Sequence, residues 1–180
     1  MAAYRCSNRV LALSLRNAPG GAELDDRGFY EGALVGRISP SLLSLSRLRH
    51  LDLSRNYLDA ALPAFLGGLR SLRYLNLSGI CISGEVPPQL GNLSRLRSLD
   101  LSSDFGTQLL RSSDLSWLAR LPLLRHLSLS SIDTSRALDW PQAVSMLPSL
   151  RILYLSSCSL PSTDQWQLPP AGLRNLTNLE

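Results

Sequence analysis

Apolar residues in the segment LRHLDLSRNYL, residues 48–58, follow an irregular spacing: Leu48, Leu51, Leu53 and Leu58, with Asn56 between the last two. An amphipathic helix repeats its apolar positions every three to four residues and a half-buried strand every two, so neither period describes this segment. The central LDL alternates as a short strand with one buried face does. We therefore expect a short strand here, flanked by turns whose leucines point inward.

The same segment recurs along the chain as LRYLNLSGICI, LRSLDLSSDF, LRHLSLSSIDT and LRILYLSSCSL. VLALSLRNA is a looser copy that begins at residue 10, and LTNLE begins another at residue 176. The starting positions 48, 72, 96, 124, 150 and 176 give periods of 24, 24, 28, 26 and 26 residues. One such unit cannot bury its own apolar face, so successive units must stack. We expect parallel strands about 4.8 Å apart, forming the concave wall of an arc.

The position of Asn56 within the repeat allows a side-chain amide to bond backbone groups that the turn leaves unpaired. Cys158 holds the same position, whereas Ile80, Asp104 and Ile132 do not match the pattern. The sequence therefore predicts a broken ladder of amides and looser turns at those three repeats.

The second half of the repeat has its own pattern. LVGRISPSLLSL (34–45) and ISGEVPPQLGNL (82–93) both follow LxGxIPxxLxxL, with Ser39 inserted before the proline in the first and Val86 in place of isoleucine in the second. LDAALPAFLGGL (58–69) keeps the proline and the leucines but has Ala60 in place of the glycine. Over residues 6–180 the chain resembles the N-terminal part of the ectodomain of plant leucine-rich-repeat receptor-like proteins and receptor kinases. The resemblance implies an α/β leucine-rich-repeat solenoid: a curved right-handed coil with a parallel concave β-sheet and a convex side of short helical or 3-10 turns and loops.

Two tryptophans depart from that pattern in the same way. Trp140 and Trp166 each stand seven residues before a leucine, at the place that Ile38 holds in an earlier repeat. We predict that both belong to the core in the convex half rather than to a ligand site. Trp117 falls outside this alignment.

The strand alternation turns the residues between and beside the paired leucines toward solvent on the concave wall. Mixed polar and aromatic side chains on a rigid sheet suit recognition of a peptide, a glycan or a protein surface, although they also suit a solvated face without a partner. Serines follow at the end of each strand, Ser54 among them. The candidate ligand-binding residues are His50, Asp52, Arg55, Tyr74, Asn76, Asp100, His126 and Tyr154.

Catalysis and metal binding are disfavoured. His50 and His126 hold equivalent positions three coils apart, so about 14 Å separates them and one metal ion cannot bind both. His50 and Asp52 lie on one face near serines, but a shallow sheet offers neither a pocket nor an oxyanion hole. No GxSxG, HExxH or CxxC motif and no glycine-rich phosphate loop is present. We expect no enzyme activity and no cofactor.

The cysteines differ in context. Cys81 and Cys158 are also about 14 Å apart, beyond the roughly 7 Å that a disulfide can span, and are predicted to be small buried apolar residues. Cys6 precedes the first coil. In the family that the chain resembles, the N-terminal cap pairs cysteines, so the resemblance implies that residues 1–9 are part of this cap and that the partner of Cys6 lies upstream. The repeats then occupy residues 10–180, about six full or partial copies, open at the C-terminus.

Three N-x-S/T triplets are candidate glycosylation sites, at Asn76, Asn92 and Asn175. Asn92 and Asn175 are predicted near loops. Asn76 is predicted on a concave strand, where a glycan would obstruct the wall.

Charge adds one expectation. The chain has 18 basic residues, all arginine, against 14 acidic ones, for a formal net charge of +4. The arginines are scattered along the sequence, which favours a solvated surface over a nucleic-acid interface, because the latter requires clustering on one face.

The sequence shows neither a signal peptide, since Arg5 and Arg9 interrupt the first residues, nor an apolar run long enough for a membrane span. The resemblance implies a non-catalytic recognition module of a receptor-like protein in defence or developmental signalling, with a protein or peptide ligand and a co-receptor, at the extracellular face of the plasma membrane. The alternatives are a secreted inhibitor of a cell-wall-degrading enzyme, similar to plant polygalacturonase inhibitors, and a degenerate product without function.

Overall fold

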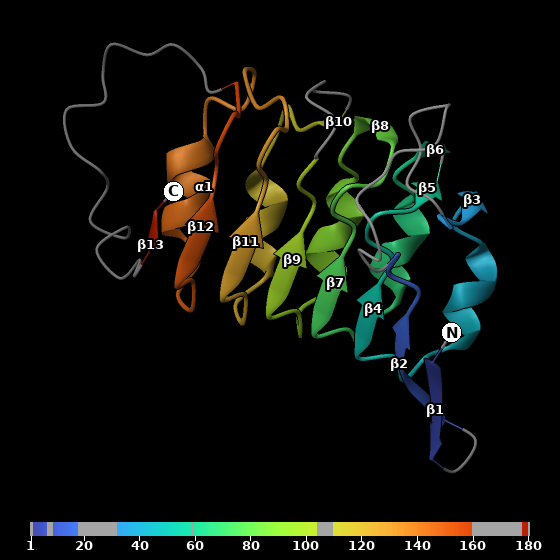
Figure 1. Ribbon diagram of the computed structural model, residues 1–180. Coiled ribbons are helices and arrows are strands. Elements are labelled where there is room, and N and C mark those ends of the chain that lie inside the picture. Colours follow the sequence, from blue (N-terminus) through green and yellow to red (C-terminus); the bar gives the residue numbers. More distant parts are fainter. Residues whose placement is uncertain are drawn as a thin grey trace.

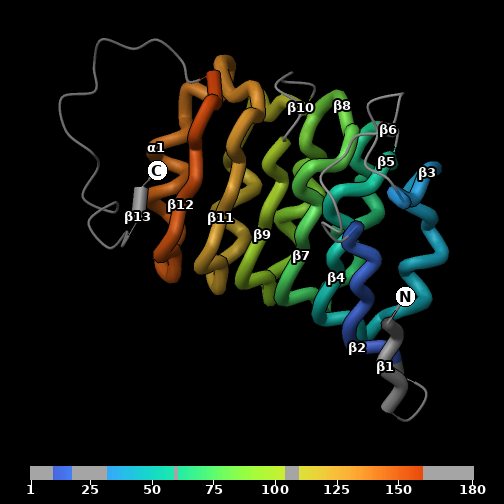
Figure 2. Tube along the Cα trace, in the orientation of Figure 1, coloured from blue at the N-terminus to red at the C-terminus, as the bar shows by residue number. Residues whose placement is uncertain are grey.

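The computed structural model describes residues 2–6, 9–17, 32–58, 60–103, 110–159 and 178–179, and its coils lie side by side along the molecule (Figures 1 and 2). Each complete coil contributes one strand to a large sheet. In the described residues this sheet has eight strands, in the order β1 (Ala2–Cys6), β2 (Arg9–Ser14), β4 (His50–Asp52), β7 (Tyr74–Asn76), β9 (Ser98–Asp100), β11 (His126–Ser128), β12 (Ile152–Tyr154) and β13 (Asn178–Leu179).

The register of the large sheet follows the repeat. The middle residue of each three-residue strand, from β4 to β12, is a leucine. These leucines pair across the sheet with one another and with a leucine of β2 and of β13, in the order Leu13, Leu51, Leu75, Leu99, Leu127, Leu153 and Leu179. The looser copy at residue 10 and the partial copy at residue 176 therefore lie in register with the five complete segments between them. Neighbouring strands run parallel except β1, which pairs antiparallel with β2 and closes that edge.

The rest of each coil returns behind the sheet through short helices. These are the 3-10 helices η1 (Pro40–Ser44), η2 (Ala64–Gly68), η3 (Pro88–Asn92) and η4 (Ser116–Arg120), and the α-helix α1 (Trp140–Ser145). Smaller parallel pairings precede them: β3 (Val35–Gly36) with β5 (Tyr57–Leu58), and β6 (Ala60–Ala61), β8 (Ile82–Glu85) and β10 (Leu110–Arg111) in a second sheet. Single bridges continue the second sheet from Arg111 to Asp133 and Ser159. The predicted α/β leucine-rich-repeat architecture is confirmed.

The core lies between the large sheet and the helices. The central strand leucines Leu51, Leu75 and Leu127 are fully buried, and so are the helix leucines Leu66 and Leu90. Burying a leucine side chain contributes about 1.5–3 kcal/mol, and here each one is covered by the same residue of the next coil.

The tryptophans belong to this core. Trp140, at the start of α1, is partly buried and packs against the leucines, in agreement with its predicted role. Trp117, in η4, is 1% exposed and is among the largest fully buried side chains, although the sequence alignment did not place it. Within the part of the chain that the structure describes, its indole Nε1 has no hydrogen-bond partner. Trp166 lies outside the described residues.

Asn56 ties the coils together as the sequence predicts. Its amide Nδ2 donates to the carbonyl oxygen of Leu15 in the preceding coil at 2.8 Å and to that of Leu53 at 2.8 Å, and its Oδ1 accepts from the Leu34 N–H at 2.9 Å. The Cys158 thiol makes the equivalent bond, donating to the Leu129 carbonyl of the preceding coil at 2.9 Å.

The expected looser turns are not found at Ile80 and Ile132. Backbone bonds join both turns to the next coil, from the Gly79 N–H to the Ser102 oxygen at 2.9 Å and from the Ser131 N–H to the Ser156 oxygen at 2.9 Å, as the Arg55 N–H joins the Asn56 turn to the Ser78 oxygen at 2.9 Å. The expectation was wrong because the turn is held by backbone bonds even where the side-chain amide is missing. Asp104 lies outside the described residues.

The turn itself has a repeated left-handed residue. Arg55, Gly79, Ser131 and Ser157, each the eighth residue of its repeat, have φ between 57° and 62°. A non-glycine residue in this region costs about 1–2 kcal/mol, so the bonds between coils must offset a local strain in three of the four turns.

Replacing Asn56 with an apolar residue of similar size tests how much its amide hydrogen bonds contribute to stability. Asn56→Ile leaves the Leu34 N–H and the Leu15 and Leu53 carbonyls without this partner at a position that is 1% exposed, so we expect a loss of about 2–4 kcal/mol in the free energy of unfolding. Chemical denaturation measures it. The control is Asn92→Ile at an exposed position, expected to change stability by about 0.5 kcal/mol or less. Equal losses for the two variants would contradict the assignment.

Close contact between the short helices gives a second test. A Cβ on Gly67 would lie 2.1 Å from the Gln89 backbone oxygen of the next coil, whereas one on Gly68 would meet only the end of the exposed Leu43 side chain. Gly67→Ala should therefore cost about 1–3 kcal/mol of stability, and Gly68→Ala should be nearly neutral. Thermal unfolding of the two variants decides between this and a loosely packed convex side, for which both alanines would be tolerated.

Candidate recognition surface

The outward-facing residues of the large sheet form two rows, which together we call the open face. The first row lies at the start of the strands and the second two residues further on, and the strand register aligns each row across the coils. The first row consists of His50, Tyr74, Ser98, His126 and Ile152, and the second of Asp52, Asn76, Asp100, Ser128 and Tyr154.

The first row presents ring-bearing side chains to solvent. His50 and Tyr74 are stacked, with ring centroids 4.2 Å apart and planes inclined by 5°. Both are partly buried, and His126, two strands beyond Tyr74, is exposed. Aromatic side chains that are already held in place lose little freedom when a partner covers them, so this row can contribute contact area at low entropic cost.

The second row has a structural role that the sequence did not reveal. The Oδ1 atoms of Asp52, Asn76 and Asp100 accept the backbone N–H two residues on, at 3.0, 2.9 and 3.0 Å. Such Asx turns let a short polar side chain satisfy the backbone where the strand ends. Part of the hydrogen-bonding capacity of these three candidates is therefore used within the fold.

Asp52 corrects a prediction directly. The sequence placed Asp52 and Ser54 at solvent-facing positions, but their exposed fractions are 6% and 2%. The two residues also bind each other, since the Ser54 hydroxyl donates to Asp52 Oδ1 at 2.6 Å and the Ser54 N–H donates to the same atom. Asp100 makes the same pair of bonds with Ser102 yet stays partly exposed.

The remaining candidates are divided between strand and turn. Tyr154 is partly buried at the end of β12, on the open face. Arg55 does not lie on a strand: it occupies the turn after β4 with φ 58° and is partly buried. The structure thus brings His50, Tyr74, Asn76, Asp100, His126 and Tyr154 to one accessible surface.

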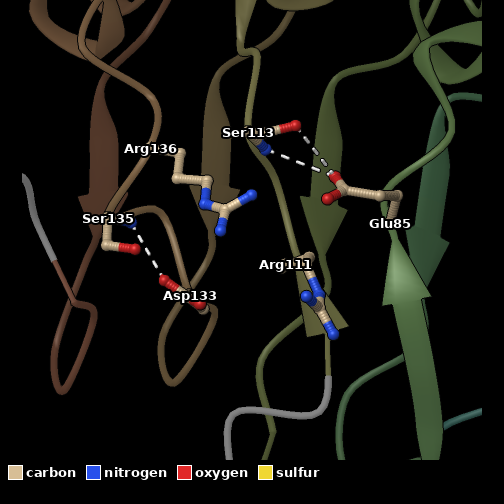
Figure 3. Close-up of a pocket in the computed structure, with 6 residues that line it drawn as sticks. All are labelled: Glu85, Arg111, Ser113, Asp133, Ser135 and Arg136. Atoms are coloured by element: carbon tan, nitrogen blue, oxygen red, sulfur yellow. Dashed lines mark hydrogen bonds between the residues drawn. The ribbon is translucent and has the colours of Figure 1, made fainter.

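A polar pocket on the second sheet was not anticipated (Figure 3). Its lining residues come from β8, β10 and the turns after Asp133, and they are Glu85, Arg111, Ser113, Asp133, Ser135 and Arg136. Glu85 accepts from both the N–H and the hydroxyl of Ser113 at 3.3 Å. These residues are far apart in the sequence and outside the leucine motif, so only the register of the second sheet could have indicated that they meet.

Asp133 is held as a carboxylate in this pocket. The Ser135 N–H bond at 3.0 Å lowers the pKa of Asp133, with smaller contributions from the Ser135 hydroxyl and the Arg111 and Arg136 guanidinium groups, while partial burial opposes the shift. The carboxylate and the two guanidinium groups leave the pocket with mixed charge rather than one dominant sign.

The cysteines behave as predicted in part. Cys81 and Cys158 are free thiols, and both are partly rather than fully buried. Burial raises the pKa of the Cys158 thiol, and the N–H groups of Ile132 and Ser131 oppose this shift. The side chain of Cys6 lies outside the described part of the structure, so its pairing stays a prediction.

The arginines correct another expectation. Residues that are scattered along the sequence come into register in the coils: Arg49, Arg73, Arg97, Arg125 and Arg151 each immediately precede a strand residue of the first row, and all five are exposed. The repeat period places these five arginines at the start of neighbouring strands. They are scattered along the sequence, as stated above, but they are not dispersed over the surface.

Among the described residues, no group of three or more His, Cys, Asp or Glu side chains could hold a metal ion. His50 and His126 lie on β4 and β11, with β7 and β9 between them.

Comparisons with known proteins agree with this architecture. The leucine-rich-repeat family models match residues 34–81, 46–104 and 149–176. The receptor-like protein EIX1 of Solanum lycopersicum is 45% identical over 128 residues, which are 71% of this chain and 12% of that protein. This chain therefore spans only a small part of that relative's length.

Two solved structures show the same fold. The ectodomain of the receptor kinase SOBIR1 from Arabidopsis thaliana is 32% identical, with a TM-score of 0.61 over 74% of this chain and 70% of that one. The ectodomain of the Arabidopsis receptor kinase HAESA, solved with a peptide hormone ligand, is 26% identical, with a TM-score of 0.65 over 84% of this chain and 24% of that one. The chain belongs to the leucine-rich-repeat family and is similar to a plant receptor-like protein and to the ectodomains of plant receptor kinases.

Proposed function

We propose that the chain is the ligand-recognition part of a plant receptor-like protein in defence or developmental signalling, and that it binds a peptide or protein segment on the open face. The observation that carries the proposal is the accessible row of rings on a rigid parallel sheet, led by the stacked His50 and Tyr74. The peptide hormone bound by the similar HAESA ectodomain supports a peptide as the class of ligand.

The chemistry of the open face also favours a peptide or protein. Hydroxyl groups, an imidazole and partly exposed Asn76 and Asp100 side chains flank the rings, so backbone and side-chain groups of an extended segment find both donors and acceptors. Rigid aromatic anchors surrounded by adaptable polar groups are typical of protein recognition surfaces.

We further propose that the binding part lies outside the cell and acts with a co-receptor, with residues 1–9 as part of a cysteine-containing cap and residues 10–180 as repeats. The similarity to the SOBIR1 ectodomain supports a place outside the cell, and the family models that match residues 34–81, 46–104 and 149–176 support the repeats. None of the short helices in the described part of the chain has the length and apolar character that a bilayer crossing requires.

A displayed library of random peptides tests the binding surface. Peptides selected on the wild-type chain should lose about tenfold or more in affinity for the His50→Ala/Tyr74→Ala variant, because removing interface hot-spot rings costs about 1–2 kcal/mol each. The control is Leu138→Ala/Met146→Ala, which removes two exposed apolar side chains beside α1 on the opposite side. Peptides that keep their affinity for the His50/Tyr74 variant and lose it for the control would contradict the proposal.

Glycosylation supplies a test of the compartment. We expect a glycan on Asn92, which is exposed at the end of η3, when the chain is directed into a secretory pathway. Asn76 should stay unmodified, because its Nδ2 donates to the Tyr74 hydroxyl at 3.2 Å and its Oδ1 accepts from Ser78 within the sheet. Asn175 lies outside the described residues.

Mass spectrometry of the glycopeptides reads both positions. Asn92→Gln should remove the mass of one glycan, and Asn76→Gln should leave the glycan mass unchanged. Occupancy at Asn76 would contradict an open face that is available to a ligand.

A further inference from the structure

One arginine per coil lies at the edge of the sheet where the strands begin. Arg49, Arg73, Arg97, Arg125 and Arg151 follow the first buried leucine of each repeat. Their backbones are linked one to the next, since each N–H from Arg73 onward donates to the preceding arginine's carbonyl at 2.8, 2.8, 2.8 and 2.9 Å. We call these five residues the arginine row. It runs along the lower edge in Figure 1, where β4, β7, β9, β11 and β12 start.

The spacing of the row is set by the fold. Parallel strands lie about 4.8 Å apart, so the five backbones span about 19 Å in a straight register. All five side chains are exposed, and those of Arg49, Arg73, Arg97 and Arg125 make no ion pair or hydrogen bond within the described residues. The row therefore offers evenly spaced cationic groups to a molecule from solvent.

Acidic residues do not balance the charge at this edge. The strand-entry segments 46–50, 70–74, 94–98, 122–126 and 148–152 contain eight of the chain's 18 arginines and none of its 14 acidic residues. Asp52, the acidic residue nearest in sequence to Arg49, lies three residues along the strand, about 10 Å away, and is buried. The eight arginines of this edge are Arg47, Arg49, Arg70, Arg73, Arg95, Arg97, Arg125 and Arg151.

A shallow hollow at the same edge provides a place where a ligand can bind. A hollow between the last two described turns is lined by Arg125, Pro148, Ser149, Leu150 and Arg151. Its floor is fixed, because the Ser149 hydroxyl donates to the Pro122 carbonyl of the neighbouring coil at 2.8 Å. The row thus ends in a shaped site with cationic walls.

We propose that the arginine row binds a linear acidic polysaccharide that carries one carboxylate on each sugar, a polyuronate. A monosaccharide unit and a coil are similar in length, so a polyuronate that lies along the row stays in step with the coils, and the long arginine side chains can reach carboxylates on either side of the polysaccharide. Guanidinium and carboxylate match in geometry and form strong charge-assisted hydrogen bonds. A partner whose charges repeat at regular intervals can bind to evenly spaced guanidinium groups without a separate pocket for each of its units.

Other polyanions fit less well. An extended acidic peptide places side chains on one face every second residue, about 6.8 Å apart, and falls out of step with the coils. Single-stranded nucleic acid also needs a series of exposed ring faces on which successive bases stack. Beside the row, His50 and Tyr74 stack on each other, and His126, two strands beyond Tyr74, is a single exposed ring.

Fluorescence anisotropy tests the proposal on the full 180-residue chain with a labelled ten-sugar polyuronate. We expect binding at low salt that weakens steeply between about 50 and 200 mM salt, as contacts between fixed charges do. Arg73→Gln/Arg97→Gln should weaken it about tenfold. The matched control Arg111→Gln/Arg136→Gln removes two exposed arginines from the pocket on the second sheet and should bind as the wild type does.

Three further probes complete the test. The fully methyl-esterified polyuronate keeps the sugars and lacks the charges, so it should not bind. A ten-residue polyglutamate and a ten-nucleotide thymidine oligomer should bind more weakly than the polyuronate. Equal loss in the two double variants, no binding at low salt, or tighter binding of either other polyanion would overturn the proposal. Circular dichroism of both variants confirms their folding, and the result is independent of peptide binding on the open face.

Discussion

The structure depends on the stacking of coils in register, because no coil can bury its own leucines. A leucine such as Leu75 is covered above and below by Leu51 and Leu99, and the backbone bonds between strands hold the three in line. A shift of one residue would turn each buried leucine to solvent and each outward residue to the core. The hydrophobic effect therefore fixes the register, and the register in turn fixes which surface side chains lie next to one another across the coils.

Each row of side chains across the coils has one physical task as a consequence. The Asp52, Asn76 and Asp100 row caps the turns that end the strands, and the Asn56 position joins neighbouring coils. These tasks use polar side chains that would otherwise look like ligand contacts. The row that begins with His50 and Tyr74 has no comparable duty in the turns, so it is the part of the open face that remains for recognition. The arginine row beside it forms a second surface, which is positively charged.

The architecture could be predicted from the sequence because it follows from spacing alone. The leucine period gave the strands, their parallel order and the inclusion of the weak copies at residues 10 and 176, and the amide bonds of Asn56 were anticipated. The site was predicted less well. Asp52 and Ser54 were placed in solvent because alternation says which side of a strand a residue is on, but not whether surrounding residues cover it. Trp117 was missed because its repeat departs from the usual spacing, and the arginine row was missed because charge was judged along the sequence instead of across the coils.

The claim that register aligns the surface rows can be measured most directly by disulfide cross-linking, in a background where Cys6, Cys81 and Cys158 are replaced by serine. Ser98→Cys/His126→Cys joins two paired positions on β9 and β11, whose Cα atoms should be about 4.8 Å apart, within disulfide range. Ser98→Cys/Ser128→Cys is offset by two residues, about 8 Å, and should not close. Rapid oxidation of the first pair alone is the expected result. Closure of the offset pair in preference to the aligned one would contradict the register, and with it the rows of recognition residues and arginines.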